Sequence, residues 1–292
     1  MQEKIQDFLN FLETEKGYAD NTIAAYRNDL TQFLRHMEEQ HKHPEESAWG
    51  EVDKDRIIGY VLNLKEREYT SSTVARKVAA IKSFFHYLVA EGILKGDPTA
   101  TLDSPKVKKR LPKAISREDI ERLLAAPAEG VSAKSQRDRA LLELLYASGV
   151  RVTELVSLDM DDVNLASGSV RVRGRKALNK ERVIPIGDRA LGPLQTYLDR
   201  GRLQLMSAPD ERALFLNHRG QRLTRQGLWL IIKHYVDEVG IAEDVTPHTL
   251  RHSFAAHKLS QGKSLQDIQK LLGHANISTT QIYQHVGQEM DA

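Results

Sequence analysis

The sequence predicts a mostly helical protein of two domains, the second of which is an α+β domain with a small β-hairpin. Three observations support this fold class. The chain has 292 residues, which is longer than a domain with one hydrophobic core usually is. Apolar residues recur at helical spacing before residue 103 and after residue 114, with a basic, proline-containing stretch between the two regions. Only "SVRVRG" and "ERVIPIG" read as short strands.

The composition is that of a folded, water-soluble protein. Hydrophobic residues make up 40% of the chain and charged residues 28%, while the net charge is only +2. A basic surface must therefore come from the distribution of charge. The absence of cysteine excludes disulfides, thiol nucleophiles and thiolate zinc sites. The chain has no signal-peptide core and no run of 18 apolar residues, so we expect a cytoplasmic protein without membrane insertion.

The first domain, residues 1–103, is predicted to consist of amphipathic helices. The segment "TSSTVARKVAAIKSFFHYLVAEG" has Ser71 or Ser72 as a helix cap, followed by an apolar stripe. The other face of this helix carries cations near its first turns. Cations beside free backbone N–H groups suit a phosphate, although solvated lysines are also common on helices. The cations in question are Arg76, Lys77 and Lys82.

Residues 104–113 are predicted to form an extended linker to a second domain at residues 114–292. The stretch "DSPKVKKRLPKAIS" contains two prolines, several cations and little that can be buried. A solvated run of charge would look the same, but the position between two helical regions favours a segment that lies along an anionic partner. The cations of the predicted linker are Lys106, Lys108, Lys109, Arg110 and Lys113, and we expect the first four to contact DNA.

The second domain is predicted to contain helices on both sides of the hairpin. Two helices precede it, and the second of them ends at Gly149. Polar N-cap residues, and Pro247 at a first helical position, support the last three helices after it. The expected helices cover about residues 116–128, 136–148, 188–206, 224–239, 247–261 and 265–273.

Polar residues near helix ends of the second domain are the candidates for chemistry. Arg151 follows the break at Gly149, where two apolar helices meet. Because an unpaired buried arginine is costly, this residue either forms a salt bridge, for which Glu154 is the candidate partner, or binds an anion. His248 and Arg251 are three positions apart on one predicted helix, so their side chains point the same way.

Two further candidates follow near the end of the chain. His274 comes after the helix-ending Gly273, a turn position from which its side chain can reach back across the domain. Tyr283 follows a helix cap at Ser278; taken alone, a tyrosine at such spacing is more often a core residue. Beside two arginines and two histidines its hydroxyl becomes a candidate nucleophile, because arginines bind phosphate oxygens and histidines exchange protons near neutral pH. The set predicts phosphoryl transfer without a metal ion.

The histidine spacing leaves one alternative, a metal site. His248 and His252 are four positions apart on one helix, which is a plausible pair of ligands. However, the glutamate of a metalloprotease helix is missing, and His257 falls well off their face. We therefore expect neither a metal ion nor another cofactor.

In this order along the chain, the motifs resemble the tyrosine recombinase/integrase family, most closely its bacterial Xer-type members. The resemblance covers nearly the whole chain and implies two domains that clamp duplex DNA. These are a SAM-like core-binding domain and a catalytic domain of the DNA breaking–rejoining type. The matching segments are "ASGVRVTELVSL", "HTLRHSFAAH", "LLGHANISTTQIY", "NKERVIPI", "GYADNTIAAYRNDLTQFL" and "SPKVKKRLPKAIS".

The resemblance also implies a mechanism and a role for each candidate residue. The family's tyrosine, Tyr283 here, attacks a DNA phosphate to give a 3′-phosphotyrosyl link and a free 5′-hydroxyl, and a 5′-hydroxyl from another duplex reverses the step. Arg151 and Arg251 would hold and neutralise the phosphate. His248 would act as an acid–base group, and His274 would support the transition state.

The family's catalytic lysine lies on the β-hairpin, and its position in this chain is ambiguous. It commonly follows a glycine in a short turn, whereas "RGRKALNKER" is longer and has Arg175 directly after Gly174. We expect Lys176 to protonate the leaving 5′-oxygen, with Lys180 as the alternative. An arginine would be a poor proton donor because its pKa is far above neutrality.

The resemblance further implies partners and a cellular role. Four protomers would act on two sites in double-stranded DNA, as a homo- or hetero-tetramer that includes a second recombinase in the latter case. The expected role is the resolution of chromosome or plasmid dimers at a dif-like site, in the nucleoid. A non-catalytic DNA-binding relative, a mobile-element integrase and a topoisomerase-like relaxing enzyme are the alternatives.

Overall fold

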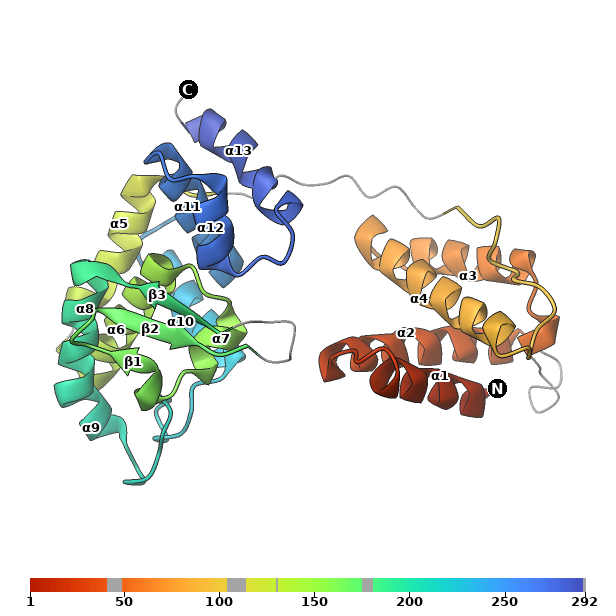
Figure 1. Ribbon diagram of the computed structural model, residues 1–292, viewed down its shortest axis with the longest axis horizontal. Helices are drawn as coiled ribbons and strands as arrows, with labels where there is room; N and C mark the ends of the chain where they lie inside the picture. Colours follow the sequence, from red (N-terminus) through yellow and green to blue (C-terminus); the bar gives the residue numbers. More distant parts are fainter. Residues whose placement is uncertain (41–48, 104–113, 130, 175–180, 291–292) are drawn as a thin grey trace. The chain divides into compact units, whose positions relative to one another are not determined.

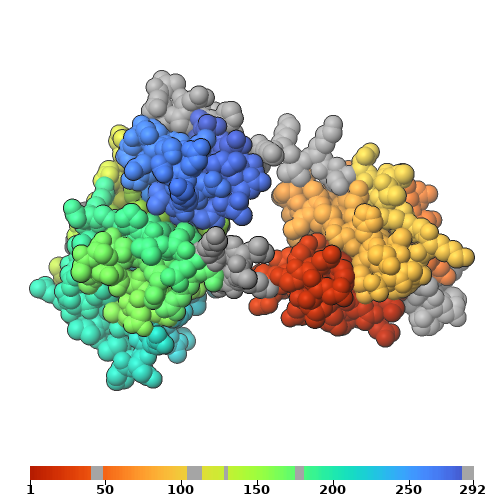
Figure 2. Space-filling view, viewed as in Figure 1, coloured from red at the N-terminus to blue at the C-terminus, as the bar shows by residue number. Residues whose placement is uncertain are grey.

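The chain is organised in two compact units, Met1–Lys109 and Arg110–Ala292. Figures 1 and 2 colour the first unit red to yellow and the second yellow-green to blue. The described residues are mostly helical, with one small sheet in the second unit, which confirms the predicted fold class. The boundary between the units falls inside the predicted linker, whose exact bounds stay a prediction. The computed structural model describes residues 1–40, 49–103, 114–129, 131–174 and 181–290.

The first unit is a helical bundle around an aromatic core. Phe33 packs edge-on against Tyr60, with 5.1 Å between ring centroids, and Trp49 packs in the same way against Phe84 at 4.7 Å. Such edge-to-face pairs stabilise a core beyond the area they bury. Its described elements are α1 (Gln2–Thr14), α2 (Asp20–Glu39), the short 3-10 helix η2 (Trp49–Glu51), α3 (Lys54–Glu66) and α4 (Ser71–Ala90).

The start of α4 differs by one residue from the prediction. The cap is Thr70, whose hydroxyl accepts a hydrogen bond from the backbone N–H of Thr73. Ser71 and Ser72 already lie inside the first turn, so the prediction that one of them caps the helix is wrong. The apolar stripe behind the cap is buried as predicted.

The second unit is built around α6 (Ala133–Ser148), which is buried along most of its length. Its buried residues include a run of leucines together with the charged Arg137, Asp138 and Glu143, which form ion pairs within the unit. Within the described residues, no helix is long and apolar enough to cross a membrane. The other helices of the unit are α5 (Arg117–Ala125), η3 (Ala126–Glu129), α7 (Val152–Ser157), η4 (Met160–Asp162), α8 (Gly187–Thr196), η5 (Tyr197–Gly201), α9 (Arg202–Leu205), α10 (Arg225–Glu238), α11 (Pro247–Ser260), α12 (Leu265–Leu272) and α13 (Ser278–Met290).

The capping residues fix where the last helices begin. Thr224, Thr246 and Ser264 each accept a hydrogen bond from the backbone N–H three residues on, and thereby cap α10, α11 and α12. Pro247 occupies the first turn of α11, where its missing N–H costs nothing. The helix expected at about 188–206 is confirmed as an uninterrupted helical run, in which the π-helical turn η5 lies between α8 and α9.

The sheet has three antiparallel strands in the order β1–β2–β3 (Figure 1). The predicted hairpin is formed by β2 (Ser169–Val172) and β3 (Arg182–Pro185), with Val170 opposite Ile184. The sequence did not predict β1 (Val163–Asn164), because two residues are too short to show the alternation of a strand.

Gly149 allows α6 and α11 to approach each other closely. It ends α6 in the left-handed region, with φ of 58°. A Cβ atom at this position would lie 2.4 Å from the ring of Phe254 on α11. Phe254 also packs with Leu272 and Tyr283, so α11, α12 and α13 share one apolar cluster (Figure 1).

Candidate active site

Arg151 lies at the junction of α6 and α7, where it is held by Glu154. Its backbone N–H donates to one Glu154 oxygen at 2.7 Å, and its guanidinium Nη1 donates to the other at 3.1 Å. Nη2 also donates to the carbonyl of Gly273 at 3.3 Å. The side chain is 39% exposed, so the salt bridge with Glu154 still leaves part of the guanidinium open to an anion.

Glu154 holds a second arginine that the sequence did not suggest. Arg182, at the start of β3, forms a forked pair with both Glu154 oxygens at 2.9 and 2.8 Å. Its Nε donates to the carbonyl of Leu271 at 3.0 Å. Burial opposes the charge of Glu154, but the hydrogen bonds from Arg182 and Arg151 outweigh it and lower the pKa of this carboxyl. Glu154 therefore links α7 to β3, and Arg182 extends this link to the end of α12.

Arg251 is buried, with 4% of the residue exposed, and points from α11 towards the same junction. It donates to the carbonyl oxygens of Gly149 and Leu272, and to Nε2 of His274 at 3.1 Å. Burial, together with the charge of Arg151, lowers the pKa of Arg251 to about 10. The group is still a cation at neutral pH, and an anion bound between the two arginines would relieve their repulsion.

His274 has both ring nitrogens engaged. A guanidinium can only donate, so Nε2 of His274 must accept the bond from Arg251. In a neutral ring the proton then lies on Nδ1, which donates to the Thr280 hydroxyl at 2.9 Å. Thr280 is fully buried in α13. His274 therefore connects the guanidinium of Arg251 to the first turn of the helix that carries Tyr283.

Tyr283 has features of both a core residue and a candidate nucleophile, the two interpretations that its sequence position allowed. Only 2% of the residue is exposed, and its ring packs in the cluster with Phe254 and Leu272. Its ring also stacks on His274, with 6.4 Å between centroids. The hydroxyl is 2.8 Å from Nδ1 of His252 on α11. The ring is thus a core group, while the oxygen faces the polar site.

The titration of these groups leaves the site positively charged at neutral pH. Burial, followed by the charges of His248 and Arg251, lowers the pKa of His252 to about 4. Burial and the nearby arginines likewise lower the pKa of His274 to about 4. Burial raises the pKa of Tyr283, and Arg251 and Arg151 oppose that shift. Two guanidinium cations therefore lie beside neutral imidazoles and a neutral phenol, which is an arrangement suited to an anion.

The structure does not place all the other candidate residues of the second unit beside Arg151, Arg251 and Tyr283. His248 is exposed in the first turn of α11, and its ring centroid is 6.5 Å from that of His252. The described residues contain no group of three histidine, aspartate or glutamate side chains that could hold a metal ion. Arg175, Lys176 and Lys180 lie outside the described residues, as do the linker cations Lys106, Lys108, Lys109 and Arg110.

The three cations predicted on α4 have different surroundings. Lys77 is 3% exposed and binds the buried carboxylate of Asp29 at 2.9 Å. Arg76 binds the same carboxylate from a half-exposed position. Lys82 is partly exposed on the same helix. The ammonium of Lys77 is therefore used inside the first unit, which leaves Arg76 and Lys82 as the cations of α4 that a phosphate could reach.

Sequence reasoning missed Arg182 and Thr280, and considered His252 only as a metal ligand. Arg182 and Thr280 lie within the quoted segments "NKERVIPI" and "ISTTQIY", but nothing in their spacing indicates their partners. The bond from Arg182 to Glu154 spans 28 positions, and the bond between His252 and Tyr283 spans 31. Contacts between distant elements depend on packing, which local periodicity does not report.

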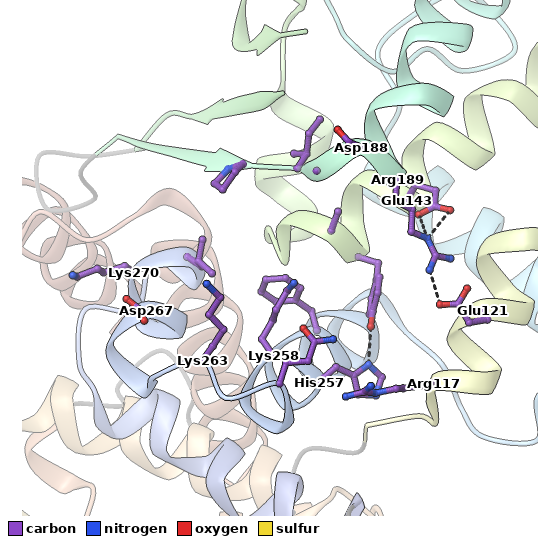
Figure 3. Close-up of a pocket in the computed structure, with 18 residues that line it drawn as sticks. Arg117, Glu121, Glu143, Asp188, Arg189, His257, Lys258, Lys263, Asp267 and Lys270 are labelled. Carbon is purple, nitrogen blue, oxygen red and sulfur yellow. Dashed lines mark hydrogen bonds and ion pairs between the residues drawn. The ribbon is translucent and has the colours of Figure 1, made fainter. Parts of the chain in front are cut away.

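A cavity of about 750 Å³ lies near the C-terminal half of α11 and contains none of the predicted catalytic side chains (Figure 3). On its wall, Nδ1 of His257 is 2.7 Å from the hydroxyl of Tyr146, and Arg189 binds both Glu143 and Glu121. The catalytic candidates are instead gathered around the ends of α6 and α12. The cavity and the candidate active site are therefore separate features of the second unit.

Solved structures with a similar fold are DNA recombinases. The crystal structure of XerA recombinase has a TM-score of 0.55 and 28% identity, and the match covers 99% of this chain and 95% of that one. XerH site-specific recombinase bound to palindromic difH substrate has a TM-score of 0.77 over 99% and 87% of the two chains. At 20% identity the XerH match shows the fold alone.

Family models and relatives of known name match almost the whole chain. Residues 113–290 match the phage integrase family, and residues 5–92 match its N-terminal SAM-like domain. Tyrosine recombinase XerC of Herpetosiphon aurantiacus is 49% identical, over 99% of this chain and 92% of that protein. Tyrosine recombinase XerD of Oceanobacillus iheyensis is 41% identical, over 97% and 93%. The chain therefore belongs to the phage integrase family of tyrosine recombinases.

Proposed function

We propose that this protein is a site-specific recombinase that cuts and rejoins DNA strands through a covalent bond between Tyr283 and a 3′-phosphate. The observation that carries the proposal is the gathering of a phenol hydroxyl and two guanidinium groups at one site. Arg251 and Arg151 lie close enough to Tyr283 to act on its pKa. Relatives named tyrosine recombinase XerC and XerD at 41–49% identity support the same function.

The proposed chemistry is a transesterification at phosphorus. The Tyr283 oxygen forms a bond to phosphorus while the bond from phosphorus to the 5′-oxygen breaks, so the number of phosphate esters is conserved. Arg151 and Arg251 bind the nonbridging oxygens and stabilise the charge of the transition state. Lys176 protonates the leaving 5′-oxygen, with Lys180 as the alternative donor, and His248 acts as an acid–base group. The reaction needs no metal ion because guanidinium groups supply the positive charge.

The surroundings of His274 and Tyr283 bear on the roles that we propose for them. His274 binds Arg251 directly, so in our proposal it supports the transition state by orienting that guanidinium. Tyr283 is 2% exposed in the free protein. Its hydroxyl must therefore become more accessible before it can reach a phosphate, which requires a shift of the first turns of α13.

The proposed substrate is double-stranded DNA, bound by both units. Arg76 and Lys82 of α4 are the proposed phosphate contacts of the first unit, together with the cations of the linker. Because Lys77 is occupied by Asp29, we do not include it. From the relatives' names and the difH substrate of XerH we propose a dif-like site, the resolution of chromosome or plasmid dimers, and four protomers on two sites, with or without a second recombinase. Such a role places the protein in the cytoplasm, at the nucleoid.

Covalent trapping tests the proposal directly. The substrate is a dif-type duplex with a nick just beyond the cleavage point, so that the short 5′-hydroxyl fragment is lost and the covalent complex accumulates. Wild type and Tyr283→Phe are compared on a denaturing gel, with EDTA present throughout. We expect a covalent complex only with wild type, while both proteins bind the duplex alike in a native gel, because the substitution removes a single oxygen.

Three other results would change the assignment. A covalent complex with Tyr283→Phe would show that another residue is the nucleophile. Complex formation that stops with EDTA and returns with a divalent cation would contradict the metal-independent mechanism. Binding without any covalent complex in wild type would indicate a DNA-binding relative that lacks the chemistry.

A further inference from the structure

His252 is the imidazole that contacts the nucleophile. Its Nδ1 lies 2.8 Å from the Tyr283 hydroxyl, and the two rings are 5.4 Å apart between centroids. His252 is on α11 and Tyr283 on α13, so the contact joins the helix of the phosphate-binding Arg251 to the helix of the nucleophile. The distance is that of a good hydrogen bond.

The other two histidines of the site are less suited to this contact. His274 uses Nε2 to accept from Arg251 and Nδ1 to donate to Thr280, so neither nitrogen is left with a lone pair for the tyrosine. His248 is exposed, and its ring centroid is 6.5 Å from that of His252. Of the three imidazoles, His252 is therefore the one positioned to receive the phenolic proton.

The protonation states at neutral pH agree with this direction of transfer. Among the described residues, the charged and titratable groups that act on or contact His252 are Arg251 and His248 on its own helix, Tyr283 on α13, and His274 before α13. Burial keeps His252 neutral at pH 7, since it lowers the pKa of this imidazole to about 4. Burial also raises the pKa of Tyr283, so the hydroxyl does not ionise unaided. When the proton of the neutral His252 ring lies on Nε2, Nδ1 accepts the hydrogen bond from this hydroxyl.

We propose that His252 is a catalytic residue that orients the Tyr283 hydroxyl and accepts its proton during attack on the phosphate. This inference rests on the proposed function. The Oη–H bond breaks as the Oη–P bond forms, and the proton passes to Nδ1 of His252. The P–O5′ bond breaks, and the leaving oxygen takes its proton from Lys176, the residue that we propose as the general acid. When a 5′-hydroxyl attacks the phosphotyrosine, its proton passes to Lys176, the Oη–P bond breaks, and His252 returns its proton to the phenolic oxygen.

The bound phosphate makes this transfer more favourable than it is in the free protein. In the free site, the imidazolium of His252 is disfavoured by burial, by His248 and by Arg251. A DNA phosphate between Arg251 and Arg151 adds negative charge, which offsets the repulsion from the arginines. We therefore expect His252 to be a stronger base in the DNA complex, when the nucleophile needs it.

The test compares three proteins that keep Tyr283 and Lys176. His252→Asn retains an acceptor oxygen near the Nδ1 position but cannot take up a proton, and His252→Leu retains neither property. His257→Asn is the matched control, because His257 lies on the same helix, is buried and also places Nδ1 2.7 Å from a tyrosine hydroxyl, that of Tyr146. DNA binding and thermal unfolding of each variant show whether it is folded.

We expect His252→Asn to reduce the rate of covalent complex formation about 100-fold at pH 7 with DNA binding unchanged, since a general base contributes about that much. His252→Leu should lose more, and His257→Asn should cleave as wild type does. The rate of His252→Asn should rise tenfold per pH unit up to alkaline pH, where the tyrosine ionises without a base. Wild type should reach its plateau at lower pH.

A modified substrate separates the base from the acid. In a 5′-bridging phosphorothiolate the sulfur leaves without protonation, so this substrate should rescue Lys176→Ala and leave His252→Asn slow. Rescue of His252→Asn, or a rate within twofold of wild type, would overturn the inference while the covalent complex of wild type still supports the proposed function. Absence of a covalent complex in wild type would overturn both.

Discussion

At the scale of single residues, Glu154 determines where Arg151, the exposed cation that we propose to bind the phosphate, lies. Its carboxylate accepts from the backbone and side chain of Arg151, and from both terminal nitrogens of Arg182. Each partner comes from a different part of the chain, so the carboxylate links α7 to β3. A cation held in this way is preorganised for the transition state, because it does not have to be ordered during the reaction.

Glu154→Gln should therefore impair both stability and cleavage. Loss of the charge leaves two guanidinium groups without their carboxylate, which should cost about 3 kcal/mol of the free energy of unfolding. A displaced Arg151 should slow covalent complex formation about 10–100-fold at a temperature where the variant is folded. Thermal unfolding and suicide-substrate cleavage measure the two effects.

The control for Glu154 is Glu143→Gln. Glu143 is buried in α6 and accepts from Arg189 at 3.0 Å, away from the catalytic candidates. This variant should also lower the unfolding temperature but should cleave at the wild-type rate. If both variants lost cleavage in proportion to stability, Glu154 would be a structural residue only.

The sequence indicated candidate side chains for the site but did not indicate the partners that hold them. His248 and Arg251 share one helix, so a local rule could relate them. The pairs that define the geometry, such as His252 with Tyr283, join helices that meet only after the core has packed. The same limit made Lys77 look like a surface cation, since its partner Asp29 lies 48 positions away.

At the scale of secondary structure elements, Gly149 both ends α6 and allows α11 to pack closely against that end. Its φ of 58° lets α6 stop abruptly, and the absence of a side chain leaves room for the ring of Phe254. The carbonyl of Gly149 also accepts from Arg251. This one turn therefore brings Arg151 near Arg251. The sequence predicted the break at Gly149, but the need for space behind it became visible only in the packed structure.

Gly149→Ala should lower the free energy of unfolding by more than the left-handed backbone conformation alone would. Gly240→Ala is the matched comparison, because Gly240 has φ of 67° but a Cβ atom there would meet no other atom of the described residues within 4 Å. The left-handed conformation should cost an alanine at Gly240 about 1–2 kcal/mol. Gly149→Ala should cost at least about twice that, because its Cβ would lie 2.4 Å from the ring of Phe254.

Thermal unfolding of the two alanine variants tests this difference. The variant Gly149→Ala, Phe254→Leu should recover part of the loss, since a smaller side chain makes room for the Cβ. Equal unfolding temperatures for Gly149→Ala and Gly240→Ala would show that α11 can move away at no cost. In that event the close contact could not be what places Arg151 beside Arg251.

At the scale of the whole molecule, the net charge is only +2, although DNA, the proposed partner, is a polyanion. Many of the basic groups are occupied within the fold, as Lys77 is by Asp29 and Arg182 is by Glu154. The sequence predicted cations in the linker and on a helix of the first domain. Composition alone does not show which cations form ion pairs within the fold and which are available to a phosphate. Salt dependence makes that distinction, because only cations that neutralise phosphates release counterions from DNA.

Three α4 variants should therefore differ in the salt dependence of DNA binding. Lys82→Ala should reduce the slope of log K against log salt by about 1, and Lys82→Arg, which keeps the charge, should leave it unchanged. Lys77→Ala should leave the slope as in wild type but lower the unfolding temperature, because it strips the buried Asp29 of a partner. Fluorescence anisotropy over a salt series, with parallel melts, measures both quantities. A slope reduced by about 1 in Lys77→Ala with an unchanged melt would mean that the Lys77–Asp29 pair opens on DNA, and that this lysine contacts a phosphate as its sequence position first suggested.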